Sequence, residues 1–192
     1  MIHPLDKAPE QGEAGLLKRL LRAGLPVAPT VAGALEEEFL RLANLQEQIG
    51  LLFQGVFGAR IDEERLFYAA ERAESLVRES YLLPERAEAF LGSLKGWQGP
   101  FLVRDSGRSP FAQARTPQEA LFALKRLYAS RYRVEEVLER WPRLFPTLDL
   151  VLVQEAGAPQ EDPGLSLKAA ELLGQPARVE AWEGRVVRVI LD

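Results

Sequence analysis

The run Leu-Asp-Leu-Val-Leu-Val-Gln at residues 148–154 constrains the fold more than any other segment of this chain. It is short and largely apolar, and turn-forming residues follow it. Such a run is typical of a strand that is covered on both faces, so we expect it at the centre of a sheet.

Most of the remaining chain has helical periodicity. Apolar residues recur every three or four positions in the longer helical segments, and shorter helices are expected between them. The expected helices cover 13–23, 35–53, 62–77, 84–92, 134–141 and 165–173. Asp62 is the expected N-cap of the third of these helices, and Gly24 takes the C′ position of the first. The Thr116-Pro117-Gln118-Glu119 capping box predicts one more helix, which ends at Ser130.

The other strand signals are few. Residues 101–104 predict one strand, and the two runs that flank Gly184, 178–183 and 185–191, predict a C-terminal β-hairpin. The expected fold class is therefore α+β: a helix-rich single domain with a small mixed sheet. Residues 1–12 are expected to form a loose lead-in that contains His3, and 13–192 to form the domain.

Composition excludes several classes of function. The formal net charge of −4 argues against a general nucleic-acid binder, which needs a basic face. The absence of cysteine excludes disulfides, thiolate metal sites and thiol nucleophiles. A single histidine in the lead-in excludes histidine-based acid–base chemistry. No catalytic residue and no metal ligand set is therefore assigned.

The same composition predicts the setting of the protein. No apolar run approaches the roughly 20 residues that span a bilayer, and the N-terminus lacks a signal-peptide pattern. We therefore expect a cytoplasmic protein without membrane contact. Arginine outnumbers lysine by 19 to 5, which suits a thermophile.

Two collinear segments carry a family resemblance. Residues 23–29 read Ala-Gly-Leu-Pro-Val-Ala-Pro, and residues 103–106 read Val-Arg-Asp-Ser. Farther on, Ser109 and residues 111–113 are similar to a loop that covers ATP phosphates in a known enzyme family. Val-Leu-Val-Gln at 151–154 is similar to a strand of the same family. In this order they resemble the nucleotide-binding domain of the phosphoenolpyruvate synthase and pyruvate phosphate dikinase family, a branch of the ATP-grasp fold. The resemblance covers 13–154 and implies the first ATP-grasp subdomain.

The chain also departs from that family. Gly12-Glu13-Ala14-Gly15 matches a Gly-Gly-Lys-Gly stretch, so Ala14 stands where the family has a phosphate-contacting lysine. Glu13 places a negative charge beside it, which would repel a triphosphate. Residues 155–192 are expected to form a loop, a short helix and the hairpin, and we therefore do not expect the second ATP-grasp subdomain within them.

The resemblance implies a site for ATP phosphates and adenine at Arg104, Ser106, Ser109 and Gln154, with MgATP as the possible cofactor. From the residues alone, Arg104 suits either a phosphate or a local ion pair with Asp105 or another carboxylate. Gln154 suits either an adenine edge or a hydrogen bond at the end of a strand. The adjacent acids Glu161 and Asp162 allow a divalent cation, but they lack further ligands.

Three functions remain open. The first is a non-catalytic, degenerate nucleotide-binding-type domain that acts as a regulatory or adaptor module with a protein partner or by self-association. The second is the MgATP-binding part of a phosphotransferase that another chain completes. The third is an unrelated thermophile α+β interaction protein. Loss of the lysine and of the second subdomain favours the first.

Overall fold

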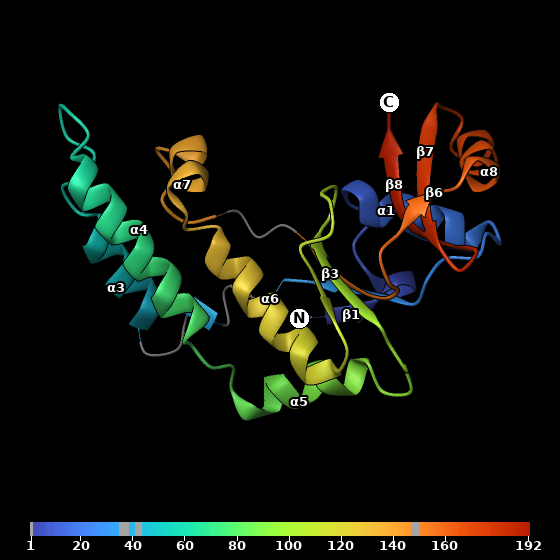
Figure 1. Cartoon of the computed structure of the whole chain (residues 1–192), viewed down its shortest axis with the longest axis horizontal. Coiled ribbons are helices and arrows are strands. Elements are labelled where there is room, and N and C mark those ends of the chain that lie inside the picture. The colour runs from blue at the N-terminus through green and yellow to red at the C-terminus, as the bar shows by residue number, and fades with distance from the viewer. Residues whose placement is uncertain (1, 35–38, 41–43, 147–149) are drawn as a thin grey trace. The chain divides into compact units, whose positions relative to one another are not determined.

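A computed structural model describes residues 2–34, 39–40, 44–146 and 150–192 (Figure 1). Within these ranges the chain forms seven α-helices and two antiparallel sheets, which confirms the predicted α+β class. Contacts divide the chain into unit 1 (Met1–Ala34, Glu88–Ala123 and Asp149–Asp192) and unit 2 (Leu35–Ala87 and Leu124–Leu148). No helix in the described ranges combines the length and hydropathy needed to cross a bilayer.

The larger sheet of unit 1 has the strand order β1-β2-β5-β3-β4. Its strands are β1 (Ile2–Pro4), β2 (Thr30–Gly33), β3 (Phe101–Asp105), β4 (Ala112–Ala114) and β5 (Val151–Glu155). Residues 151–154 of the predicted apolar run lie in β5, whose central place between β2 and β3 is as predicted, while residues 148 and 149 of that run lie outside the described residues. Every pairing in this sheet is antiparallel, so the expected mixed sheet is corrected. Long connections that contain helices separate β2 from β3 and β4 from β5 in the chain. Connections of that length allow neighbouring strands to run in either direction.

The N-terminal residues are ordered by this sheet. We expected a loose lead-in, but β1 pairs with β2 and places His3 opposite Ala32. A short 3₁₀ turn (Leu5–Lys7) follows, and the side chain of Leu5 is buried. A three-residue edge strand that ends in proline has too little alternation to be recognised from sequence.

The smaller sheet contains the predicted C-terminal hairpin. Its order is β6 (Gln160–Glu161), β7 (Ala177–Trp182) and β8 (Arg185–Leu191). The two turn residues, Glu183 and Gly184, both have positive φ, 48° and 75°. Positive φ at both central residues is the type I′ geometry that matches the twist of the flanking strands.

Two helices of unit 1 share a core with this hairpin. Helix α1 (Gly12–Arg22) is followed by Gly24 in the predicted C′ position, with φ 91°, and the Leu25 N–H donates to the Leu20 carbonyl at 3.0 Å. Helix α8 (Pro163–Leu173) begins after Asp162, whose carboxylate accepts the Leu165 N–H at 3.0 Å. Buried side chains from both helices and the hairpin form one cluster, which includes Leu17, Leu20, Ala169, Leu173, Val179 and Val186.

Unit 2 contains α3 (Leu45–Phe53), α4 (Glu63–Arg78) and α7 (Val134–Arg140). The helix that we expected over 35–53 is not continuous, because Asn44 is left-handed, with φ 56°, immediately before α3. Residues 35–38 and 41–43 of that prediction lie outside the described residues. The predicted N-cap is confirmed: Asp62 accepts the Arg65 N–H at 3.2 Å.

Two helices contribute residues to both units: α5 (Pro84–Ser93) and α6 (Pro117–Ser130). The Thr116 half of the predicted capping box of α6 is confirmed, since the Glu119 N–H donates to the Thr116 hydroxyl at 3.1 Å. The Glu119 carboxylate in turn accepts the Arg115 N–H at 2.7 Å. Both α6 ends match the sequence prediction.

The cap of α8 gives a stability prediction. Asp162→Ala should lower the free energy of unfolding by about 1 kcal/mol, because the N–H of Leu165 loses its acceptor at the helix start. Chemical denaturation followed by circular dichroism measures this loss. Glu161→Ala, at the exposed neighbouring carboxylate, is the matched control and should stay within about 0.5 kcal/mol of the parent. Equal losses in the two variants would show that the cap contributes nothing of its own.

Candidate functional site: a buried arginine and its carboxylate

Arg104 lies at the centre of the predicted site, and its side chain is 0% exposed. It is the fourth residue of β3, where it pairs with Leu152 of the central strand. The side chain reaches the first turn of α1, and Glu13 there is 5% exposed. The two charges therefore meet in the interior of unit 1, where an unpaired charge would be costly.

Glu13 binds the guanidinium through both carboxylate oxygens. Nη1 of Arg104 lies 2.5 Å from Oε1 of Glu13, and Nη2 lies 2.8 Å from Oε2. This is the two-point geometry that makes arginine–carboxylate pairs strong. The same carboxylate accepts two backbone N–H groups, from Gly107 at 2.8 Å and from Val189 at 2.9 Å.

The remaining guanidinium donors are also used. Nε donates to the Gln154 side-chain oxygen at 3.0 Å, and Nη2 donates to the Val187 carbonyl at 2.9 Å. The second N–H of Nη1 has the carbonyls of Asp105 and Arg108 at 3.5 and 3.4 Å. A guanidinium has five N–H donors, so in this conformation none is left for a ligand.

Gln154 extends the same network. It is fully buried on β5, and its Nε2 donates to the Val187 carbonyl at 2.8 Å and to the Thr30 hydroxyl at 3.2 Å. The Thr30 hydroxyl donates to the Ala28 carbonyl at 2.8 Å. The amide is thus committed at both ends to groups of the protein.

The two serines of the predicted site lie in the loop after β3. Ser106 is half-buried, and its N–H donates to the Leu150 carbonyl at 2.9 Å. Ser109 is exposed, and its hydroxyl lies 3.4 Å from Nη1 of Arg188, which also pairs with Glu180 at 3.3 Å. The structure therefore joins Arg104 to Gln154 directly, while the hydroxyl of Ser109 is placed with a different arginine.

Glu13 is the residue of this site whose role the sequence did not indicate. It is separated from Arg104 by 91 positions, so no local pattern connects the two. The sequence allowed an ion pair of Arg104 with Asp105 or with another carboxylate, and the structure pairs it with Glu13. Asp105 follows Arg104 on a strand, where successive side chains point to opposite faces. An acidic residue in the first turn of a helix was the one available signal, since helix N-termini favour negative charge.

The other charged groups that the structure describes form no metal site. Among the described residues, no three His, Asp or Glu side chains lie close enough together to hold a metal ion. Asp162, of the adjacent acidic pair Glu161 and Asp162, caps α8.

In unit 2, burial lowers the pKa of the Lys125 ammonium, which donates to the Ser80 carbonyl at 2.6 Å.

Comparison with known proteins adds no family assignment: no known family model matches the chain, and a search of curated proteins finds no significant match.

The buried pair gives a second stability prediction. Arg104→Met should lower the free energy of unfolding by about 3–5 kcal/mol, because it leaves the Glu13 carboxylate buried without a counter-charge. Adding Glu13→Gln removes that charge, so the double variant should be more stable than Arg104→Met alone. A double-mutant cycle on denaturation midpoints measures the coupling.

The matched control is Arg178→Met, which removes an exposed ion pair with Asp192. That substitution should cost at most about 1 kcal/mol. If Arg104→Met and Arg178→Met cost the same, or if the cycle shows no coupling, the buried pair has no special energetic role.

Proposed function

We propose that this chain is a non-catalytic regulatory or adaptor module, related to the nucleotide-binding domain of the phosphoenolpyruvate synthase and pyruvate phosphate dikinase family, with its phosphate site filled by its own carboxylate. One observation carries this proposal. All five N–H donors of Arg104, the residue that the resemblance assigns to phosphate, are engaged by groups of the protein, with Glu13 as the anion.

The surroundings of Glu13 have the chemistry of an anion site. A guanidinium fork and two backbone N–H groups, from Gly107 and Val189, converge on the carboxylate. Guanidinium groups and backbone amides are the donors that proteins use for phosphate. Ala14, where the family has its lysine, is fully buried among apolar side chains and supplies no cation.

The phosphotransferase alternative requires this arrangement to open. Arg104 would have to exchange Glu13 for a phosphate, which leaves the Glu13 carboxylate in the interior beside a second anion. Separating a buried pair in this way costs about 3–5 kcal/mol before any ligand contact forms. The non-catalytic function needs no such rearrangement.

Exposed aromatic side chains support the partner-binding half of the proposal. Phe67 and Tyr68 on α4 are 59% and 64% exposed, and Tyr81 after the same helix is 78% exposed. Large aromatic residues are enriched in protein–protein interfaces relative to the rest of a protein surface. They lie in unit 2, in a different part of the chain from the filled anion site.

The proposal predicts that nucleotide does not bind. Calorimetric titration with MgATP to millimolar concentration should give no binding heat, and light scattering should give the same molar mass with and without nucleotide. Micromolar binding that is lost in Arg104→Lys and retained in the exposed control Arg22→Lys would overturn the proposal and favour the phosphotransferase. Lysine keeps the charge of Arg104 and loses its fork, which makes the comparison specific.

A filled anion site also predicts chemical rescue. Glu13→Ala should be destabilised, and inorganic phosphate or acetate should recover stability, because Arg104 and two N–H groups would then face an empty site. The recovery should grow with the logarithm of anion concentration above its dissociation constant.

Thermal unfolding at matched ionic strength measures the rescue, with the parent and Glu10→Ala as controls, since Glu10 pairs with Arg22 at the surface. If Glu13→Ala does not fold, the milder Glu13→Gln takes its place. Equal anion effects in all variants would contradict an anion site at this position.

A further inference from the structure

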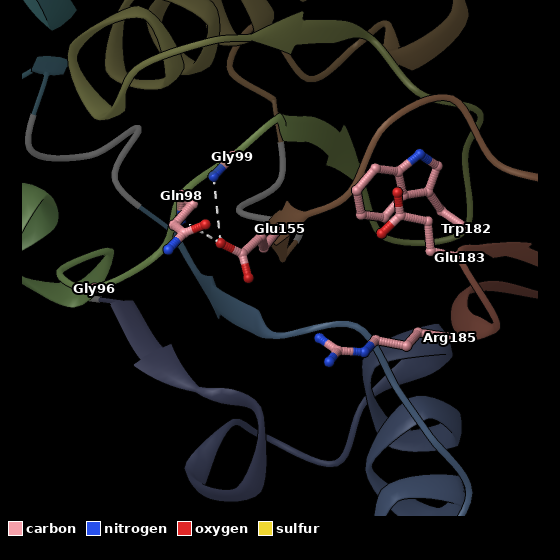
Figure 2. Close-up of a pocket in the computed structure, with 7 residues that line it drawn as sticks. All are labelled: Gly96, Gln98, Gly99, Glu155, Trp182, Glu183 and Arg185. Atoms are coloured by element: carbon pink, nitrogen blue, oxygen red, sulfur yellow. Dashed lines mark hydrogen bonds between the residues drawn. The ribbon is translucent and has the colours of Figure 1, made fainter.

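Unit 1 also contains an open pocket that shares no lining residue with the Arg104 network. It is a pocket of about 420 Å³, lined by residues that precede β3, by the end of β5 and by the hairpin turn between β7 and β8. Small-molecule sites have volumes of about 300–1,000 Å³. Figure 2 shows that Glu155 and Arg185 extend from different elements toward the same open space. The lining residues are Gly96, Gln98, Gly99, Glu155, Trp182, Glu183 and Arg185.

The Glu155 carboxylate is held in a fixed orientation. Its Oε2 accepts the backbone N–H groups of Gln98 at 2.5 Å and of Gly99 at 3.3 Å. These two bonds occupy one oxygen, as the dashed lines in Figure 2 show, and Oε1 has no hydrogen bond to any described residue. The pocket thus presents a preoriented acceptor oxygen that no described residue of the protein donates to.

Arg185 supplies the opposite charge. It is exposed at the start of β8, and within the described ranges its guanidinium makes no ion pair or side-chain hydrogen bond. Two carboxylates line the same pocket, yet neither pairs with it. A cation and an anion held apart across a hollow suit a ligand that carries both charges.

Trp182 forms a rigid wall. Its indole packs over Gly157, where an added Cβ would lie 2.6 Å from Nε1. The ring can occupy this position only because glycine has no side chain. The ring also packs against a small buried cluster that includes Leu102 and Val187. An aromatic face beside carboxylates favours an alkyl stem that ends in a cation.

Glu183 adds a second carboxylate to the pocket, and its backbone has a positive φ that is unfavourable for glutamate. It occupies the first central position of the type I′ turn with φ 48°, where Asn, Asp or Gly is favoured. A non-glycine residue in a left-handed conformation is disfavoured unless its side chain adapts to it. The choice of glutamate there places a negative charge on the pocket rim.

From this chemistry we propose that the pocket binds a free basic α-amino acid such as arginine or lysine. The pocket offers two carboxylates, one guanidinium and an aromatic wall, and a basic amino acid offers two cations, one carboxylate and an alkyl stem. The ligand carboxylate pairs with Arg185, its two cations pair with Glu155 and Glu183, and its stem lies on Trp182. Phosphate-bearing ligands are disfavoured by the two carboxylates. This site is independent of the proposed loss of nucleotide binding.

Calorimetry on the unmodified chain tests the ligand class with four probes at matched ionic strength. L-Arginine or L-lysine should bind saturably. Agmatine, which lacks the carboxylate, and L-norleucine, which lacks the side-chain cation, should bind at least about tenfold more weakly. Equal binding of agmatine would overturn the amino-acid assignment, and absence of saturable binding by both basic amino acids would overturn the site.

Variants locate the binding. Arg185→Gln and Glu183→Asn should each raise the dissociation constant about tenfold or more while the unfolding midpoint is kept, since both positions are exposed and asparagine suits the turn. Arg178→Gln, on the same hairpin but outside the pocket, is the matched control and should bind as the parent does. Binding that is unchanged in Arg185→Gln would overturn the proposal.

A spectroscopic readout places the ligand on the indole. The chain has three tryptophans, so Trp97→Phe/Trp141→Phe leaves Trp182 as the reporter. Saturable change of its fluorescence with the calorimetric midpoint supports contact with the ring. Calorimetric binding without any fluorescence change would place the ligand elsewhere and overturn the site.

Discussion

The ion pair between Arg104 and Glu13 ties together parts of unit 1 that are distant in the sequence. Through it, β3 is connected to the first turn of α1, to Gln154 on β5 and to the backbone of β8. Burying two charges has a desolvation cost of several kcal/mol for each, which is offset only when every donor and acceptor finds a partner. Here the partners come from four elements, so those elements fit together in one arrangement.

Short-range features of this fold were predictable because they depend on neighbouring residues. Asp62 and Thr116 cap their helices, and Gly24 and Gly184 adopt the left-handed conformations that end a helix and close a hairpin. The apolar run of β5 likewise indicated its central place. These signals are local hydrogen bonds and backbone preferences, which a single sequence displays directly.

Long-range features were not predictable in the same way. The antiparallel order of the larger sheet depends on pairings between segments such as 101–105 and 151–155, and no residue pattern specifies strand direction. The sequence allowed Asp105 or another carboxylate as the partner of Arg104, but it could not identify Glu13, which the fold brings from 91 positions away. A pocket assembled from three separate segments leaves no contiguous motif at all.

The C-terminal hairpin serves both sites of unit 1. On β8, the backbone of Val187 and Val189 completes the interior network, while Arg185 at its start and Trp182 at the end of β7 line the open pocket. Trp182 also packs on the small cluster that contains Val187. The interior contacts of β8 therefore set the position of the hairpin residues that the pocket presents to solvent.

The order in which a ribosome makes this chain has a consequence for its folding. Unit 1 is assembled from three separated segments, and Glu13 receives its last hydrogen bond from Val189, 176 positions later. The residues of unit 2 are all synthesised before the hairpin emerges. The hydrogen bonds of Glu13 to Val189 and of Arg104 to Val187 can therefore form only after all of unit 2 has been synthesised. Proteins whose contacts span most of the chain fold slowly, because loop closure precedes the energetic gain.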